Sequence, residues 1–296
     1  MNRLDHRITI LARKPGQPLI PVDEPNTPSS IDFTMTNPPF YPSADALLQS
    51  AARKSHPPHS ACTGAEVEMV TPGGEVAFVT RIVEESLVLR ERVQWYTAMF
   101  GFLESVSKIV ERLRSGGVGN IAVTEFVQGS QTRRWAVGWS FGAMRPADDV
   151  ARGVSASKFG GILPPATKAV VIRLPTDEKV GALADSLASA IGQLDLLRWD
   201  WDKQRLEGVG RAPDNVWNRA WRRKMKREAE AHQDENRETL VAENSRAAFG
   251  FRVSVHVGRE QIEVTAEWLE GHDATVFESF QGYLKTTMAS LSKPKQ

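Results

Sequence analysis

Two consecutive prolines directly after a short strand-like run are the feature that most limits how this chain can fold. Ile31–Thr36 alternates weakly between apolar and polar residues, as a β-strand does, and leads into Asn37-Pro38-Pro39-Phe40. Proline lacks an amide hydrogen and fixes its own φ angle, so neither a helix nor a strand ladder continues through such a pair. The chain must therefore leave the sheet at Asn37, in a rigid loop.

Hydrophobic spacing predicts that this strand belongs to an α/β sheet. The predicted order is strand, helix, strand, helix, strand, strand, which describes a sheet that ends in an antiparallel pair. After the first strand, these elements are Glu75–Leu89, Val93–Phe100, Ser105–Arg114, Ile121–Val127 and Arg134–Phe141. A further short strand is predicted at Arg7–Ala12. The polar stretch Tyr41–Pro72 is predicted to be a long loop.

A second, smaller α+β domain is predicted after a segment rich in glycine, proline and serine, Ala143–Ala166. We expect a first domain at 1–145, a linker at 146–166 and a second domain at 167–296. The predicted elements of the second domain are a strand at Lys168–Leu174, a helix at Asp177–Leu194, a strand at Leu196–Leu206, a basic helix at Asn215–Glu230, a hairpin of Arg252–Val257 and Ile262–Trp268, and a helix at Ala274–Leu291.

Composition excludes some classes of protein and leaves others open. Hydrophobic residues make up 41% and charged residues 25%, which is ordinary for a globular protein. No apolar run approaches the roughly 20 residues that span a bilayer, so no membrane partner is predicted. Cys62 is the single cysteine, which rules out an intrachain disulfide and fits a reducing compartment. A net charge of +1 neither favours nor excludes nucleic acid.

The rigid loop carries groups suited to chemistry on an amino group of a nucleobase. The amino group of adenine is a poor nucleophile because its lone pair is delocalised into the ring. The side-chain oxygen of Asn37 and the carbonyl oxygen of Pro38 are neutral acceptors that could bind its hydrogens. Phe40 offers an apolar face on which a flipped-out base can stack. The tetrapeptide could equally be an ordinary turn, but its place after a strand favours the functional interpretation.

Three blocks of sequence resemble a known family, the adenine-N(6) methyltransferases of U6 small nuclear RNA and their bacterial relatives that modify 23S ribosomal RNA. The blocks are IDFTMTNPPFY, CTGAEVEMVTPGGEVAFVTRIVEESLVLRERVQWYTAMFG and VTEFVQGSQTRRWAVGWSF. The resemblance covers about Asn2 to Phe141. It implies a Rossmann-like methyltransferase fold, S-adenosylmethionine as the methyl donor, and a structured RNA as substrate, either U6 snRNA or an rRNA hairpin. A nuclear location follows for a U6 enzyme, with the cytoplasm as the alternative.

The resemblance also implies roles for individual residues. The catalytic motif of the family maps onto Asn37, Pro38, Pro39 and Phe40, and its asparagine also contacts the donor. A basic loop of the family matches the segment with Arg53 and Lys54. The RNA-contacting hairpin of the family matches Gln128 to Arg134, which makes the candidate RNA contacts Gln128, Arg133 and Arg134.

The sequence departs from the family at the donor site. Methyltransferases of this type bind the donor with a glycine-rich turn after the first strand, and no such turn is present. Gly116-Gly117-x-Gly119 follows a predicted helix, so it is not that turn. We therefore expect a sheet that is incomplete at its N-terminal side. We interpret the chain as a truncated gene model of an enzyme, and the alternative is a non-catalytic RNA-binding remnant.

The second domain contains a local basic block. Arg222, Arg223, Lys226 and Arg227 lie within six positions of a predicted helix and form one stripe suited to an RNA backbone. Trp217 and Trp221, four residues apart, are expected to anchor the opposite side. A solvated helix and a nuclear import signal are the other interpretations of this block. The domain also resembles, in architecture alone, the RNA-binding module that follows the catalytic domain in some members of the family.

Two further hypotheses were weighed. His56, His59 and Cys62 have a superficial likeness to metal ligands, but the prolines between them and the lack of a fourth ligand favour a polar loop, so no metal is predicted. The Asn-Pro-Pro-aromatic motif also serves DNA adenine methyltransferases. The predicted basic loop and the three family blocks favour RNA as the substrate.

Overall fold

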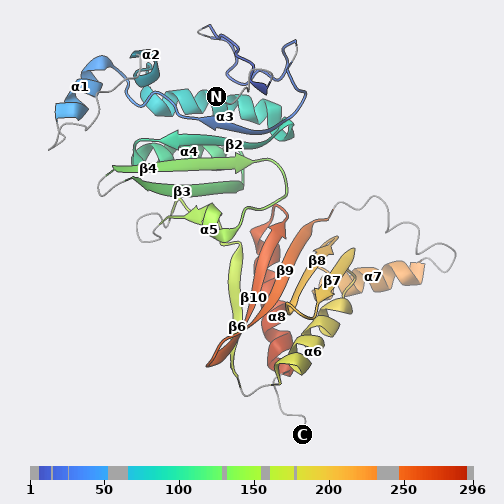
Figure 1. The fold of residues 1–296 in the computed structure, drawn as a ribbon. Coiled ribbons are helices and arrows are strands. Elements are labelled where there is room, and N and C mark those ends of the chain that lie inside the picture. The colour runs from blue at the N-terminus through green and yellow to red at the C-terminus, as the bar shows by residue number, and fades with distance from the viewer. Residues whose placement is uncertain are drawn as a thin grey trace. The chain divides into compact units, whose positions relative to one another are not determined.

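The computed structural model describes residues 7–14, 16–25, 27–52, 66–128, 132–154, 161–176, 179–231 and 247–291. The chain divides into two compact units, Met1–Gly142 and Ala143–Gln296. The first unit is a Rossmann-like α/β sheet with helices, and the second is an α+β unit with an antiparallel sheet (Figure 1). None of the described helices is both long and apolar enough to span a membrane.

The fourth strand of the first unit, β4 (Thr132–Ser140), lies in the interior of its sheet. The strands β1 (Ile31–Thr36), β2 (Val93–Phe100), β3 (Asn120–Gln128) and β4 lie in the order β1-β2-β4-β3. β1 and β2 are parallel, so the chain between them must cross over the sheet, and α3 (Gly74–Leu89) lies in that connection. β4 is antiparallel to both of its neighbours.

The core of the first unit lies between this sheet and two helices, α3 and α4 (Leu103–Ser115), which pack on β2 and β4. Trp139 of β4 stacks on Tyr96 of β2 with ring centroids 5.6 Å apart. Its indole Nε1 donates a hydrogen bond to Ser86 Oγ of α3 at 3.0 Å. A buried indole needs such a partner, so this bond fixes the helix against the sheet.

The structure corrects two predictions for the first unit. Arg7–Ala12 forms no strand, because within the described residues no neighbouring strand pairs with it. Tyr41–Pro72 is not a plain loop, since it includes α1 (Ala44–Ala52) and α2 (Glu66–Met69). The start of α1 carries a signal that was overlooked: Ser43 Oγ accepts a hydrogen bond from Ala46 N at 3.2 Å, as an N-cap residue does. The other strands and helices predicted for this unit are confirmed.

The second unit is built on a five-stranded antiparallel sheet. Its order is β6-β10-β9-β8-β7, from β6 (Lys168–Pro175), β7 (Arg198–Asp202), β8 (Glu207–Ala212), β9 (Phe249–Val257) and β10 (Gln261–Glu270). α6 (Val180–Gly192) and α8 (Ala274–Leu291) enclose the core with it. Buried aromatic rings dominate this core: Phe251 lies 4.3 Å from Phe280 between centroids.

Three predictions for the second unit needed correction. The single strand expected at Leu196–Leu206 is β7 followed by a turn, and β8 was missed because two glycines weaken its pattern. The expected linker Ala143–Ala166 includes α5 (Asp148–Ala151) and β5 (Arg152–Gly153). The basic helix α7 spans Arg219–Ala231, so it begins later than predicted. The short 3₁₀ helix η2 (Arg90–Arg92) of the first unit was also not predicted.

Gly208 on β8 gives a stability prediction. A Cβ atom there would lie 2.2 Å from Trp199 Cη2 and 2.7 Å from Trp201 Cε3, so neither indole could keep its place. We expect Gly208→Ala to destabilise the second unit by about 1–3 kcal/mol or more in denaturant unfolding. Gly282→Ala is the matched control, because a Cβ there meets nothing within 4 Å in the middle of α8. It should stabilise by about 0.5–1 kcal/mol. Equal effects of the two changes would contradict this packing.

Candidate active site

The Asn-Pro-Pro-Phe loop lies at the carboxyl end of β1, where the chain leaves the sheet as the prolines require. Asn37 is exposed, Pro38 is buried, and Pro39 and Phe40 are half-buried. A buried proline between an exposed amide and a half-exposed ring keeps both groups at the surface on a fixed backbone. The loop therefore presents the Asn37 side chain from a rigid support.

Main-chain contacts hold the residues that follow the motif. Tyr41 N donates to Met69 O at 3.1 Å, and Thr71 N donates to Tyr41 O at 3.0 Å. Gly74, with a φ of 64°, approaches the loop so closely that a Cβ there would lie 3.1 Å from Phe40 O. Glycine tolerates both this angle and this approach, and so lets α3 begin directly beside the motif.

The half-buried Phe40 ring has two close neighbours from other elements, Gly101 and Arg134. A Cβ on Gly101, just after β2, would lie 3.3 Å from its Cγ and Cδ1 atoms. The guanidinium carbon of Arg134 on β4 lies 5.3 Å from its centroid, within the range of a cation–π contact. Arg134 therefore contacts the motif, and Arg133 instead forms an ion pair with Glu125 at 2.7 Å.

Glu75 is a polar residue of this region that sequence reasoning missed. It is only 2% exposed, and its carboxylate accepts hydrogen bonds from the main-chain amides of Gly101 at 2.7 Å and Phe102 at 3.1 Å. Desolvation by burial raises its pKa, while the bonds from Ser105 and the two amides, with the charge of Arg134, oppose this. No signal set it apart, because glutamate in a first helical turn is ordinary.

A cavity of about 420 Å³ borders the loop on the side of β1. Asn37 contributes to its wall with residues of β1, Phe78 and Ile82 of α3, and the segment Leu19–Pro21. Glu85 of α3 holds that segment by accepting hydrogen bonds from Leu19 N and Ile20 N at 2.8–2.9 Å. Phe33 and Met35 of β1 are 62% and 84% exposed, so one side of this region is open.

The basic residues of α7 in the second unit lie on its exposed side. Arg222, Arg223, Lys226 and Arg227 are all exposed, whereas Trp221 and Met225 are half-buried. At about 100° per residue the two sets lie on opposite faces. Trp221 anchors the helix as predicted, since its Nε1 donates to Asp195 Oδ2 at 2.8 Å. Trp217 precedes the helix and packs in the core, 4.8 Å from Phe280 between centroids.

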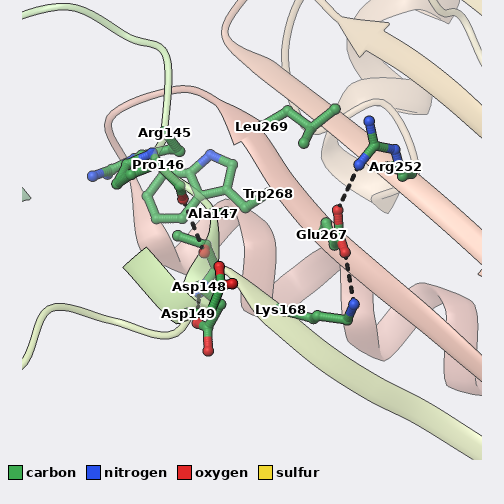
Figure 2. Close-up of a pocket in the computed structure, with 11 residues that line it drawn as sticks. Arg145, Pro146, Ala147, Asp148, Asp149, Lys168, Arg252, Glu267, Trp268 and Leu269 are labelled. Carbon is green, nitrogen blue, oxygen red and sulfur yellow. Dashed lines mark hydrogen bonds and ion pairs between the residues drawn. The ribbon is translucent and has the colours of Figure 1, made fainter. Parts of the chain in front are cut away.

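The second unit also has a cavity of about 420 Å³, drawn in Figure 2. Arg145 lies 3.7 Å from the centroid of the Trp268 ring, and burial lowers its pKa to about 10. Beside it, Glu267 pairs with both Lys168 and Arg252 at 2.9 Å. Each charge of this trio already has a partner, so the cavity is a poor match for a phosphate group.

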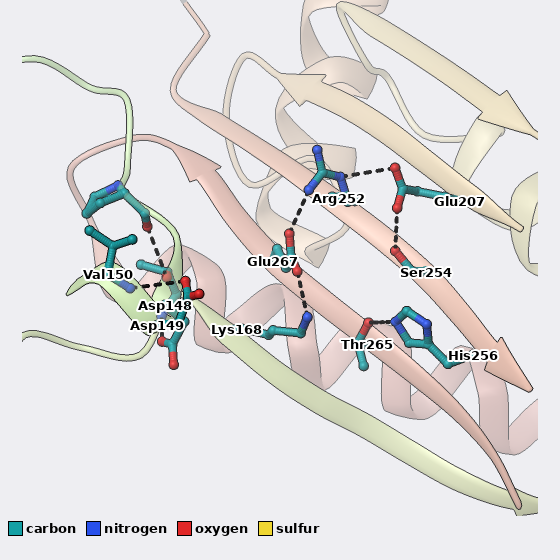
Figure 3. Close-up of polar contacts among 12 residues, drawn as sticks. Asp148, Asp149, Val150, Lys168, Glu207, Arg252, Ser254, His256, Thr265 and Glu267 are labelled. Carbon is teal, nitrogen blue, oxygen red and sulfur yellow. Dashed lines mark hydrogen bonds and ion pairs between the residues drawn. The ribbon is translucent and has the colours of Figure 1, made fainter. Parts of the chain in front are cut away.

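Figure 3 shows that the pairing of charged and polar side chains around Glu267 continues along the same face of the five-stranded sheet of the second unit. Arg252 also approaches Glu207 at 3.2 Å, and Glu207 accepts a hydrogen bond from Ser254 Oγ at the same distance. Arg173 with Glu263 and Arg211 with Glu270 extend the pattern. This face is balanced in charge, whereas the exposed side of α7 carries four basic side chains. Within the described residues no cluster of His, Cys, Asp and Glu could hold a metal ion.

Residues 2–143 match a family model described as RNA methyltransferase. The first unit is therefore similar to the RNA methyltransferases of this family. The chain is 31% identical over 279 residues to the U6 small nuclear RNA (adenine-(43)-N(6))-methyltransferase of Schizosaccharomyces pombe, which covers 94% of this chain and 65% of that protein. It is 43% identical over 114 residues to the human RNA N(6)-adenosine-methyltransferase METTL16, over 37% of this chain.

The chain therefore spans about two thirds of the fission yeast protein, and its match to human METTL16 covers 20% of that protein. Among solved structures, the hMettl16 catalytic domain in complex with MAT2A 3′UTR hairpin 1 is 41% identical, over 38% of this chain and 40% of that one, with a TM-score of 0.34. The N-terminal domain of human METTL16 in complex with SAH is 35% identical, over 40% of this chain and 35% of that one, with a TM-score of 0.28.

In the first unit, the structure brings some of the predicted site residues together. The motif loop and Arg134 meet at Phe40, although they are almost 100 positions apart in the sequence. Gln128 ends β3 opposite Thr132, at the end of the hairpin. Arg53 and Lys54 lie outside the described residues, as do His56, His59 and Cys62.

Proposed function

We propose that this protein transfers a methyl group from S-adenosylmethionine to the exocyclic amino group of an adenosine in a structured RNA, with U6 snRNA as the preferred candidate. The observation that carries the proposal is the exposed Asn37 amide on a rigid loop, at the wall of a cavity and three residues from the half-buried Phe40 ring. The RNA methyltransferase family of residues 2–143 and the U6 enzyme of fission yeast support it.

The residues of the loop divide the work of the reaction. The side-chain oxygen of Asn37 and the carbonyl oxygen of Pro38 each accept a hydrogen bond from one N–H of the amino group. These hydrogen bonds return electron density to the nitrogen. Phe40 stacks on the flipped-out base, which contributes about 1–3 kcal/mol. S-adenosylmethionine supplies an electrophilic methyl group when bound. The chain accelerates the transfer mainly by orientation, because its acceptors are fixed before the base arrives.

Asn37 is the residue of this chain that would contact both the donor and the base. The cavity beside β1 suits the donor because Asn37 forms part of its wall together with residues of β1. The sequence has no glycine-rich turn after a strand. We therefore assign to Asn37 and the residues of β1 one wall of the donor site.

We expect residues 1–296 alone to bind S-adenosylmethionine weakly, with a Kd well above the micromolar range, because the glycine-rich turn is absent. Isothermal titration calorimetry of the purified chain measures this directly. The same titration with a form of the protein that carries a glycine-rich donor segment is the control, and it should bind tightly. Micromolar binding to residues 1–296 would mean that other residues build the donor site.

We assign the RNA contacts to the hairpin of the first unit and to α7 of the second. The basic side chains of α7 are exposed on one side of the helix, whereas those of the neighbouring sheet face are neutralised by carboxylates. Phosphate contacts need basic side chains that face the solvent, which favours the helix. A U6 substrate also places the protein in the nucleus.

The competing function is RNA binding without methyl transfer, which the missing glycine-rich turn favours. One assay separates the two. A U6 snRNA fragment is incubated with the protein and S-adenosylmethionine, digested to nucleosides, and analysed by mass spectrometry for N(6)-methyladenosine. The DNA oligonucleotide of the same sequence tests the DNA alternative. RNA binding without any methylated nucleoside, in a form that binds the donor, would reject the proposed function.

A further inference from the structure

Three donors converge on the buried carboxylate of Glu75. Gly101 N donates to Oε2 at 2.7 Å and Phe102 N donates to Oε1 at 3.1 Å, so each oxygen serves one main-chain amide. The hydroxyl of Ser105, itself buried, is the third donor. A buried carboxylate with this many partners fixes the backbone it binds, because every alternative position leaves a buried charge unpaired.

The backbone that Glu75 fixes is the wall against which the motif lies. Gly101 approaches the Phe40 ring so closely that a Cβ would lie 3.3 Å from two ring carbons. Phe102 packs edge-on against Tyr41 with centroids 6.1 Å apart. Arg134 also lies over the Phe40 ring and acts electrostatically on Glu75. Phe40 thus has two neighbours, Gly101 and Arg134, that both interact with Glu75.

We propose that Glu75 is a positioning residue for methyl transfer, because its carboxylate fixes Gly101 and Phe102 and thereby sets where the Phe40 ring meets the target base. This inference rests on the proposed function. Glu75 does not touch the base or the donor, and acts through the wall beneath Phe40.

The ionised form of Glu75 is the form that holds this wall. Only a carboxylate offers an acceptor oxygen to each of the two amides, whereas a protonated acid or an amide turns a donor toward one of them. Burial raises the pKa of Glu75 above that of an exposed glutamate. The groups that face it from neighbouring elements are Arg134 of β4 and Ser105 of α4, and both favour the charged form.

Glu75→Gln is the direct test, because glutamine has the shape of the protonated acid. In a form of the protein that binds the donor, with a U6 snRNA fragment as substrate, we expect kcat to fall about 10-fold to 100-fold. KM for the RNA should stay within about twofold. The wild-type kcat should fall as pH is lowered through the raised pKa of Glu75. The kcat of Glu75→Gln should be low at every pH and should not show this fall at acidic pH.

Three further variants separate positioning from general damage. Ser86→Ala removes another fully buried polar group of α3, whose Oγ accepts the hydrogen bond of Trp139. It should lower Tm, yet keep the wild-type kcat and pH profile below the unfolding transition. Gly101→Ala should lower kcat by crowding Phe40 at 3.3 Å, while its Cβ would meet Glu75 Oε2 at 3.4 Å in an ordinary contact that keeps the carboxylate and its charge. Gly138→Ala, where the nearest atoms would be 3.7 Å away, should leave kcat unchanged.

The outcomes also separate this inference from the proposed function. If the wild type methylates the RNA and Glu75→Gln does so at the same rate with the same pH profile, Glu75 is not a positioning residue. A wild type that transfers no methyl group contradicts the proposed function alone. In that case, hydrogen exchange of the Gly101 and Phe102 amides still tests the wall. Faster exchange in Glu75→Gln supports it, and unchanged exchange overturns it.

Discussion

Replacing Asn37 by alanine is expected to lower the rate of methyl transfer by about 10²-fold or more while RNA affinity stays nearly the same. The loss corresponds to one preorganised polar contact to the reacting group. RNA affinity should hardly change, because most of it comes from phosphate contacts elsewhere. Single-turnover methylation of a U6 snRNA fragment, in a form that binds the donor, and binding by fluorescence anisotropy give the two quantities.

Two variants make this result specific. Asn37→Gln keeps the amide and moves it by one methylene, so it should be almost as slow as alanine if position matters. Asp32→Ala removes an exposed polar side chain from β1, the strand that leads into the loop, and should leave the rate unchanged. Wild-type turnover by Asn37→Ala would remove Asn37 from the mechanism.

Replacing Arg222, Arg223, Lys226 and Arg227 together by glutamate is expected to weaken RNA binding for many RNA sequences. Each lost phosphate contact lowers the slope of log affinity against log salt by about 0.7–0.9, so four contacts change it by about 3. The second unit should remain folded, because all four side chains are exposed and Trp221 still anchors the helix. Binding measured between low and moderate salt gives affinity and slope together, and circular dichroism checks the fold.

The charge change itself needs a control of equal size. Lys179, Lys203, Arg205 and Arg259 are exposed in the same unit but lie outside α7. Their replacement by glutamate changes the net charge by the same amount and should affect the slope far less. If both quadruple variants weaken binding equally, the effect comes from overall charge. If neither does, α7 is a solvated surface or an import signal, and RNA binding depends on the first unit.

Sequence patterns predicted most of this fold because local periodicity and turn residues decide most of its elements. α3, α4 and α8 have regular helical spacing, and β9 and β10 alternate clearly around Gly258. β8 was missed since Gly208 and Gly210 remove side chains from its buried face, where aromatic rings of other strands fill the space. A strand that depends on its neighbours for its packing carries little signal of its own.

The candidate site also has one part that the sequence predicts and another that depends on tertiary structure. The Asn-Pro-Pro-Phe loop could be predicted, because two prolines dictate a local conformation. The contact between Arg134 and Phe40 could not, since it depends on β4 lying next to β2 in the sheet. Glu75 was missed for a related reason: its partners Gly101 and Phe102 follow a different strand, and tertiary structure alone brings them to the start of α3.

The interior position of β4 has a consequence for how the first unit acquires its structure during synthesis. β4 ends at Ser140, yet it separates β2 from β3, which both precede it in the chain. Until the ribosome has released these residues, β2 has one unpaired edge and β3 has no partner within this part of the sheet. Such unpaired edges are the usual starting points of aggregation. The nascent first unit is therefore most prone to aggregation just before β4 emerges. A pause in translation at that point would expose its unpaired strand edges to chaperones for longest.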